Sequence, residues 1–135
     1  MKKITVYLDM DGTIANLYNQ PNWLERLLAE DETPFTECEP MTTEENLFRL
    51  FPKDRYEIKV LTMTPKNATK EYCEKVIIAK ENWLNRFFPN IKTRIYKPYG
   101  NNKNLANAHR HILIDDNETI RKNYKGTAIN PTELW

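Results

Sequence analysis

Two carboxylate side chains, Asp9 and Asp11, stand two residues apart immediately after a short run of β-forming residues at 4–8. At the carboxyl end of a strand in an open parallel sheet, both side chains can face the crevice in which ligands bind. Gly12 permits a sharp turn of the backbone there, and Thr13 adds a hydroxyl group to the same turn. The spacing therefore predicts a carboxylate site at this edge of the sheet.

A second acidic pair, Asp115 and Asp116, ends another hydrophobic run at 111–115 and is followed by Asn117. Two acidic clusters cannot lie together unpaired in a partly dry cleft, because like charges repel strongly there. A hard divalent cation with oxygen ligands would balance the charge, and Mg²⁺ is the natural choice. We therefore expect the two clusters to share a magnesium ion.

A hydroxyl group and a lysine supply chemistry that suits a phosphate group. Thr62 and Met63 end the second β-rich run, where a hydroxyl and free backbone amides can bind a phosphate oxygen. Lys80 falls within the apolar stripe of a predicted helix at 69–88, and a buried lysine needs an anionic partner. Lys80 could instead direct its ammonium group to solvent, and Lys103 is the rival phosphate-binding lysine.

Simpler interpretations apply to some of these residues. A calcium loop of the EF-hand type needs glycine at its sixth position and glutamate at its twelfth. Counted from Asp9, the glycine is fourth and the twelfth position holds Gln20, so the spacing argues against such a loop. The pair at 115–116, taken alone, could be a turn or a helix cap. His109 and His111 have no metal-ligand spacing and are expected to be structural.

The elements that must position these residues alternate along the chain. Runs of β-branched and apolar residues predict five strands, at 4–8, 57–62, 93–96, 111–115 and 126–129. Apolar spacing, caps and prolines predict helices at 22–30, from Thr42 or Thr43 to 51, at 69–88, 103–108 and 118–123. The acidic, proline-broken stretch 31–40 is expected to be a loop. The alternation predicts a single α/β domain, with a parallel sheet covered by helices on both faces.

Composition and charge narrow the function classes. Hydrophobic residues make up 40% of the 135 residues and charged residues 29%, which is typical of a globular protein. The net charge of +1 argues against a protein that binds nucleic acid mainly through its phosphates. No apolar run approaches the roughly 20 residues that span a bilayer, and the first residues lack the features of a signal peptide. Two cysteines are too few and too far apart for a zinc site or a disulfide scaffold, so we expect a cytoplasmic protein without a membrane partner.

Together these elements resemble the sequence motifs of the haloacid dehalogenase superfamily of phosphohydrolases. The family's Asp-x-Asp-Gly-Thr motif is complete at 9–13, and its second motif is matched by Thr62. The family's lysine is matched by Lys80, and its acidic pair by Asp115 and Asp116. The resemblance covers nearly the whole chain and implies a Rossmann-like sheet with the strand order 3-2-1-4-5.

Within the superfamily, the chain is most similar to the 5′(3′)-deoxyribonucleotidase-like group. The stretches 61–65, 80–84 and 113–116 are similar to that group's Thr-x-x-Pro, Lys-x-x-Trp and Leu-Ile-Asp-Asp patterns. That group carries a sizeable helical cap, whereas this chain leaves only about 16–40 for a minimal cap insert. The cleft is therefore expected to be more open than in the group it resembles. Tyr18 and Trp23, in this insert, are candidates for stacking on a nucleobase.

The resemblance implies a role for each of these residues. Asp9 would attack phosphorus and form an aspartyl-phosphate, and Asp11 would act as general acid and then as general base. Mg²⁺ would be held by Asp9, by the backbone carbonyl of Asp11 and by Asp115. The phosphoryl oxygens would be bound by Thr62, Met63, Lys80 and Gly12. Supporting contacts would come from Asp116, Asn117 and Thr13.

The resemblance thus implies a Mg²⁺-dependent phosphomonoesterase that acts on a nucleoside monophosphate, including a deoxy one. The same chemistry could serve another substrate, such as a polynucleotide 3′-phosphate, a sugar phosphate or a phosphoprotein. A different class of function is a non-catalytic protein that binds a phosphorylated ligand on the same scaffold. The complete set of Asp9, Asp11, Lys80 and Asp115 argues against that alternative. The oligomeric state stays open at this point.

Overall fold

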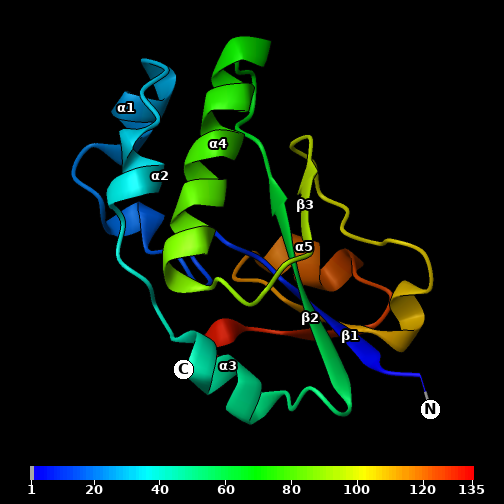
Figure 1. Ribbon diagram of the computed structural model, residues 1–135. Helices are drawn as coiled ribbons and strands as arrows, with labels where there is room; N and C mark the ends of the chain where they lie inside the picture. Colours follow the sequence, from blue (N-terminus) through cyan, green and yellow to red (C-terminus); the bar gives the residue numbers. More distant parts are fainter. Residues whose placement is uncertain (1) are drawn as a thin grey trace.

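The computed structural model describes residues 2–135 as an α/β fold built on one five-stranded sheet (Figure 1). Its strands are β1 (Ile4–Leu8), β2 (Tyr56–Met63), β3 (Arg94–Lys97), β4 (Ile112–Ile114) and β5 (Thr127–Ile129). They lie in the order β3-β2-β1-β4-β5, and every neighbouring pair is parallel. The structure therefore confirms the predicted Rossmann-like sheet and its strand order.

The α-helices of the described chain are α1 (Trp23–Leu28), α2 (Thr33–Glu37), α3 (Glu44–Leu50), α4 (Lys70–Phe87) and α5 (Glu118–Asn123). Single 3₁₀ turns are η1 (Leu17–Asn19), η2 (Ala108–Arg110) and η3 (Pro131–Glu133). The side chains of Thr43, Thr69 and Asn117 accept hydrogen bonds from backbone N–H groups in the first turns of α3, α4 and α5. Each of these helices therefore begins at a capping residue. Across residues 2–135, every helix is too short or too polar to cross a membrane.

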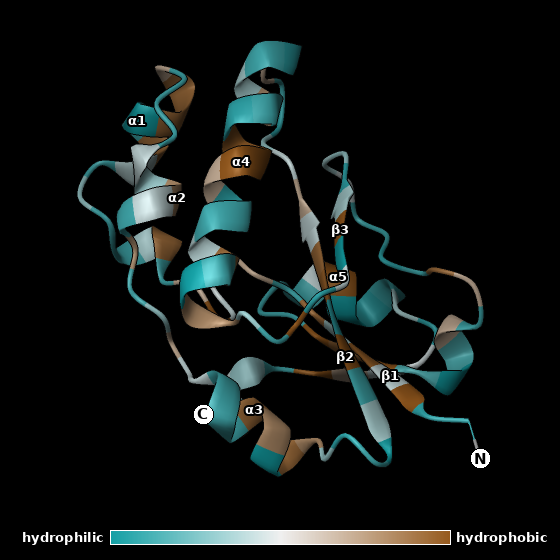
Figure 2. Cartoon of the chain, viewed as in Figure 1, coloured by the Kyte–Doolittle hydropathy of each residue, from teal (hydrophilic) through white to brown (hydrophobic). Residues whose placement is uncertain are grey.

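Successive residues of the central strands point to opposite faces of the sheet and bury two separate cores. On one face, Val6 and Leu8 pack in a cluster with Trp83 of α4. On the other face, Tyr7 packs in a cluster with Ile120 of α5. Figure 2 shows brown, hydrophobic segments in the central strands and bands of teal and brown along α4. The sheet is thus covered by helices on both faces, as the sequence predicts.

The insert at 16–40 lies over α4 and is more ordered than the sequence predicts. The prediction of a loop across 31–40 is wrong, because this stretch contains α2. Pro34 lies in the first turn of α2, where a missing backbone N–H costs no helical hydrogen bond. Phe35 is buried in a cluster with Tyr72 of α4, and this packing holds the short helix in place.

The predicted helix at 103–108 is also wrong. Residues 103–107 form no helix, and only the single turn η2 follows them. Asn107 adopts the left-handed conformation with φ of 62°, which interrupts a helix at that residue. The Lys103 side chain is buried in the interior, so this stretch follows a path set by a distant contact rather than by its own helical preference.

Candidate active site

Three neighbouring strands end at one edge of the sheet and bring together the residues that the sequence singled out. Asp9 directly follows β1, Thr62 lies near the end of β2, and Asp115 directly follows β4. Since β1 pairs in parallel with both β2 and β4, their carboxyl ends lie side by side. All three side chains belong to buried residues. The fold therefore supplies a polar centre that is largely withdrawn from water.

Lys103 bridges two of the carboxylates. Its Nζ donates to Asp9 Oδ1 at 2.8 Å and to Asp115 Oδ2 at 2.7 Å. The side chain is 1% exposed. Burial alone would lower the pKa of Lys103, but the negative charges of Asp9 and Asp115 raise it above its ordinary value. The ammonium group therefore stays charged and fixes the orientation of both acids.

Lys80 reaches the same centre from the middle of α4. Its Nζ donates to Asp11 Oδ2 at 2.9 Å and to Thr62 Oγ1 at 2.8 Å. A third hydrogen bond, of 3.0 Å, reaches the carbonyl oxygen of Met63. Its side chain is 1% exposed, so the ammonium group points into the site and not to solvent. Lys80 and Lys103 thus both point into the site, Lys80 paired with Asp11 and Lys103 with Asp9 and Asp115.

Asp11 has the properties of a proton donor. Burial raises the pKa of Asp11 above its usual range, although the positive charge of Lys80 acts in the opposite direction. Its Oδ2 accepts from Lys80, whereas its Oδ1 is buried and has no hydrogen-bond partner within residues 2–135. A buried oxygen without a hydrogen-bond partner lowers the stability of the fold unless another group supplies a hydrogen bond or a proton to it. Asp11 therefore holds a proton more readily than an ordinary aspartate and keeps one oxygen available.

Thr13 joins the two acidic clusters. Its hydroxyl is 3.0 Å from Asp9 Oδ2, to which it donates, and it accepts from the backbone N–H of Asp116 at 3.2 Å. The indole Nε1 of Trp135 donates to the carbonyl oxygen of Thr13 at 3.0 Å. Trp135 thus restrains the backbone of Thr13, while the Thr13 side chain orients Asp9. Nothing in the spacing of the motifs indicated the contribution of Trp135.

Gly12 is required by the shape of the turn. Its φ is +81°, a conformation that side chains with a Cβ rarely adopt. A Cβ at this position would lie 2.6 Å from the ring of Tyr18 and would collide with the carboxylate of Asp116. The N–H of Gly12 donates to the carbonyl of Ala15 at 2.9 Å. Gly12 therefore contributes the turn itself rather than a free amide.

Three carboxylates have oxygens within 4.8 Å of one another, namely those of Asp9, Asp115 and Asp116. Burial and then a hydrogen bond with Asp9 raise the pKa of Asp116 to about 8. Burial and the charge of Asp9 raise the pKa of Asp115 to about 6. Burial also acts to raise the pKa of Asp9, but the charge of Lys103 and several hydrogen bonds outweigh it and hold that pKa below its usual value. The negative charge is therefore crowded, and Asp9 keeps the ionised form.

The charge balance of the site fits a divalent cation. When the three clustered carboxylates and Asp11 are all ionised, their four negative charges face only the two ammonium groups of Lys80 and Lys103, an excess of two that the raised pKa values of Asp11, Asp115 and Asp116 reflect. The available ligands are carboxylate oxygens, which hard divalent cations prefer. The sequence placed Asp116 beside the metal site, and the structure brings its carboxylate into the same group as Asp9 and Asp115. The Asp11 carboxylate lies outside this group and faces Lys80.

A cleft of about 560 Å³ opens over these residues, a volume within the range of small-molecule sites. We call its base the charged floor, which consists of Asp9, Asp11, Lys103, Asp115 and Asp116. We call the side formed by the insert the apolar wall, which consists of Leu17, Tyr18, Trp23, Leu24, Leu27 and Leu28. The cleft thus offers a charged end and an apolar side to one ligand.

Asp115 receives further support from α5. The backbone N–H of Asn117, the cap of α5, donates to Asp115 Oδ1 at 2.9 Å. Arg121 Nη1 donates to the carbonyl oxygen of Asp115 at 3.0 Å. The sequence indicated Asn117 as a supporting residue but gave no reason to select Arg121 among the other basic residues.

No protein-family model matches this sequence, and no curated protein is significantly similar to it.

Proposed function

We propose that this protein is a Mg²⁺-dependent phosphomonoesterase of the haloacid dehalogenase superfamily that acts through an aspartyl-phosphate on Asp9. The observation that carries the proposal is the contrast between two neighbouring acids. Asp9 is ionised and oriented by Lys103 and Thr13, whereas the pKa of Asp11 is raised by burial. A nucleophile needs the first environment, and a proton donor needs the second.

In the first step, a carboxylate oxygen of Asp9 attacks phosphorus in line with the ester bond. A new bond forms between this oxygen and phosphorus, and the bond between phosphorus and the ester oxygen breaks. The leaving alkoxide takes the proton of Asp11, whose unpartnered Oδ1 is the available atom. Such proton transfer contributes roughly 10²–10⁴-fold in rate. Asp9 then carries the phosphoryl group, and the alcohol is free to leave.

In the second step, Asp11 is a carboxylate and acts as general base. It removes a proton from a water molecule that attacks the phosphorus of the aspartyl-phosphate. The bond between Asp9 and phosphorus breaks, inorganic phosphate is released, and both acids return to their starting forms. Lys80 remains paired with Asp11 throughout and offsets part of its negative charge in this step.

The remaining residues bind and orient the phosphoryl group. Asp9, Asp115 and Asp116, with the backbone carbonyl of Asp11, would hold Mg²⁺, which would supply positive charge that allows one anion to approach another. The Thr62 hydroxyl accepts from Lys80 at the end of β2 and can donate its own hydrogen to a phosphoryl oxygen, while the Lys80 ammonium adds positive charge beside it. The Lys103 ammonium keeps Asp9 aimed at the cleft.

The apolar wall supports a nucleoside monophosphate as substrate. Leu24 is 52% exposed and Leu28 is 76% exposed, yet both line the same cleft as the reacting acids. Tyr18 and Trp23 meet edge to face at 4.8 Å on that wall. The planar nucleobase of such a substrate would cover these apolar side chains, whereas a sugar phosphate would place hydroxyl groups against them. The two free cysteines support a reducing compartment such as the cytoplasm.

The test is phosphate release from a panel of phosphomonoesters, measured with Mg²⁺ and with a chelator. The panel contains deoxynucleoside 5′- and 3′-monophosphates, sugar phosphates, a phosphopeptide and a 3′-phosphorylated oligonucleotide. We expect Mg²⁺-dependent release that is greatest for the mononucleotides. Asp9→Asn should lower kcat by about 10⁴-fold or more, because it removes the nucleophile.

A matched control is Asp54→Asn, since Asp54 is an exposed aspartate that lies outside the cleft. This variant should release phosphate at the rate of the unmodified protein. Equal release by Asp9→Asn would refute the proposed nucleophile. Binding of nucleoside monophosphates without release from any substrate would instead favour a non-catalytic ligand-binding protein.

A further inference from the structure

Lys103 lies in a stretch without helix or strand and is nevertheless buried. The segment 98–107 runs from the end of β3 to η2 through bends and turns (Figure 1). A lysine on an irregular segment has many conformations to lose when it is fixed between two carboxylates. Its exact placement between Asp9 and Asp115 therefore requires other contacts that restrain this segment.

The residue after Lys103 supplies the first restraint. Asn104 Nδ2 donates to the carbonyl oxygen of Asn123 at 2.8 Å, and Asn104 Oδ1 accepts from the backbone N–H of Lys125 at 2.7 Å. Both ends of one side-chain amide are thus satisfied by the backbone at the end of α5. An aspartate or an alanine at this position could not make both bonds.

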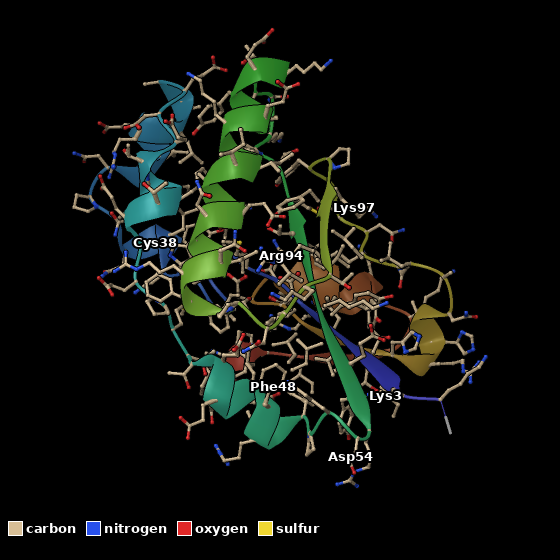
Figure 3. The ribbon with its side chains drawn as sticks, viewed as in Figure 1. Lys3, Cys38, Phe48, Asp54, Arg94 and Lys97 are labelled. Atoms are coloured by element: carbon tan, nitrogen blue, oxygen red, sulfur yellow. The ribbon has the colours of Figure 1, made fainter. Side chains whose placement is uncertain are left out.

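The second restraint acts before Lys103. Asn123 Nδ2 donates to the carbonyl oxygen of Asn101 at 3.3 Å. Lys97 Nζ, at the end of β3 (Figure 3), donates to the carbonyl oxygen of Asn102 at 2.9 Å. The chain is therefore held on both sides of Lys103, and Asn123 takes part on both sides through its side chain and its carbonyl.

The helix α5 and its cap also contact one of the partners of Lys103. The cap Asn117 and Arg121 both donate to Asp115, as described above. The same short helix therefore contacts Asp115 through its cap Asn117 and through Arg121, and it contacts the segment that carries Lys103 through Asn123. Both Asp115 and the segment that carries Lys103 are thus linked to one helix.

We propose that Asn104 and Asn123 form an amide clamp that positions Lys103 against Asp9 and Asp115. They are positioning residues, since neither contacts the floor itself. The structural part of this inference stands without the proposed function, and only its effect on rate rests on the phosphomonoesterase activity. We expect that loss of the clamp makes the Lys103 side chain accessible while the rest of the fold is retained.

The experiment is reductive dimethylation of the folded protein with formaldehyde and a borane, followed by peptide mass spectrometry of each lysine. We expect Lys103 and Lys80 to be protected in the unmodified protein, because each is 1% exposed. In Asn104→Ala and Asn123→Ala, Lys103 should react about tenfold faster, because lost hydrogen bonds favour local opening. Lys80, which is held by α4, should stay protected and reports that the fold is intact.

Two further variants sharpen the test. Asn104→Asp keeps an acceptor for the Lys125 N–H and loses only the donor, so its effect should lie between those of Asn104→Ala and the unmodified protein. Asn101 takes part in the clamp through its backbone carbonyl, which Asn101→Ala retains. This variant should therefore leave Lys103 protected. Lys103 that stays protected in Asn104→Ala and Asn123→Ala would overturn the proposal. Loss of protection at both lysines would also overturn it, because it would mean general unfolding.

Phosphate release is then measured on the same samples. With the best substrate, we expect the clamp variants to lower kcat by about tenfold and to change KM less, because Lys103 orients the nucleophile. If Lys103 becomes reactive but kcat is unchanged, Lys103 does not need this placement for catalysis, and that part of the proposal is overturned. If the unmodified protein releases no phosphate, the proposed function fails, and lysine reactivity alone still decides whether the clamp exists.

Discussion

The charged floor and the apolar wall of the same cleft are built in opposite ways. The floor lies on the sheet, and Lys103 there is fixed between Asp9 and Asp115. The wall is made largely by α1, which has no buried residue and carries exposed leucines. A buried network of hydrogen bonds and ion pairs is rigid because each broken contact costs free energy. A lightly packed helix can change its conformation at a small cost in free energy.

On the proposed function, this difference assigns the chemistry to the floor and the selectivity to the wall. Changes in the floor should alter the rate of the chemical step and the stability, since its groups are buried and mutually paired. Changes in the wall should alter substrate binding and leave the chemistry intact. Variants of the floor and of the wall can therefore separate these two effects.

The largest combined effect on rate and stability is expected from removing a buried ammonium group from the floor. Lys103→Met keeps the apolar stem and removes the charge, which leaves Asp9 and Asp115 without their shared partner. We expect kcat to fall by about 10²–10³-fold, and the free energy of unfolding to fall by about 3–5 kcal/mol without added Mg²⁺. Steady-state kinetics and urea unfolding measure the two effects. Lys92→Met, at an exposed position, is the control.

An intermediate effect concerns the pH dependence of stability. The pKa of Asp116 is raised to about 8 in the folded protein, from an ordinary value of 3.8. A raised folded-state pKa means that stability is fully present at low pH and is lost as pH rises through about 8. Without metal, the free energy of unfolding should therefore fall between about pH 4 and about pH 8 more steeply in the unmodified protein than in Asp116→Asn.

Added Mg²⁺ should reduce this difference, because a bound cation stabilises the ionised carboxylates. Urea unfolding at several pH values, with Mg²⁺ and with a chelator, provides the measurement. Equal pH slopes for the two proteins without metal would show that Asp116 does not take up a proton on folding. The crowding of charge on the floor would then be weaker than described above.

The smallest effect is expected from the wall. Leu24→Asp places a charge on the exposed apolar side of the cleft and should raise KM for nucleoside monophosphates by about five- to tenfold. The value of kcat should change little, because no group of the floor is altered. Ile78→Asp is the matched control, since Ile78 is 62% exposed and does not line the cleft. A fall in kcat with KM unchanged would contradict the division between wall and floor.

The sequence predicts most of the fold because its strongest signals are local. Strands β1, β2 and β4 are short runs of β-branched and apolar residues, and the long helix α4 begins at a capping threonine. Gly12 and the acids at 9–13 follow β1 directly, so their position at the edge of the sheet follows from the strand alone. These elements depend little on the rest of the molecule.

The two errors have a common physical cause. The helix α2 exists because Phe35 packs against α4, and the path of 103–107 is set by contacts to α5 and to the floor. Both depend on residues that are distant in sequence, which a local pattern does not reveal. For the same reason, the sequence left Lys80 and Lys103 as rivals, whereas the structure pairs Lys80 with Asp11 and Lys103 with both Asp9 and Asp115.

The most direct test of the account is whether Asp9 carries the phosphoryl group during turnover. Asp11→Asn slows the hydrolysis of the aspartyl-phosphate, while an aryl phosphate, whose leaving group needs no proton, still reacts in the first step. The reaction of this variant with p-nitrophenyl phosphate and Mg²⁺ is quenched in acid and analysed by peptide mass spectrometry. The account predicts one added phosphoryl group on Asp9 and none with a chelator. Phosphate release by this variant without any phosphorylated Asp9 would contradict it.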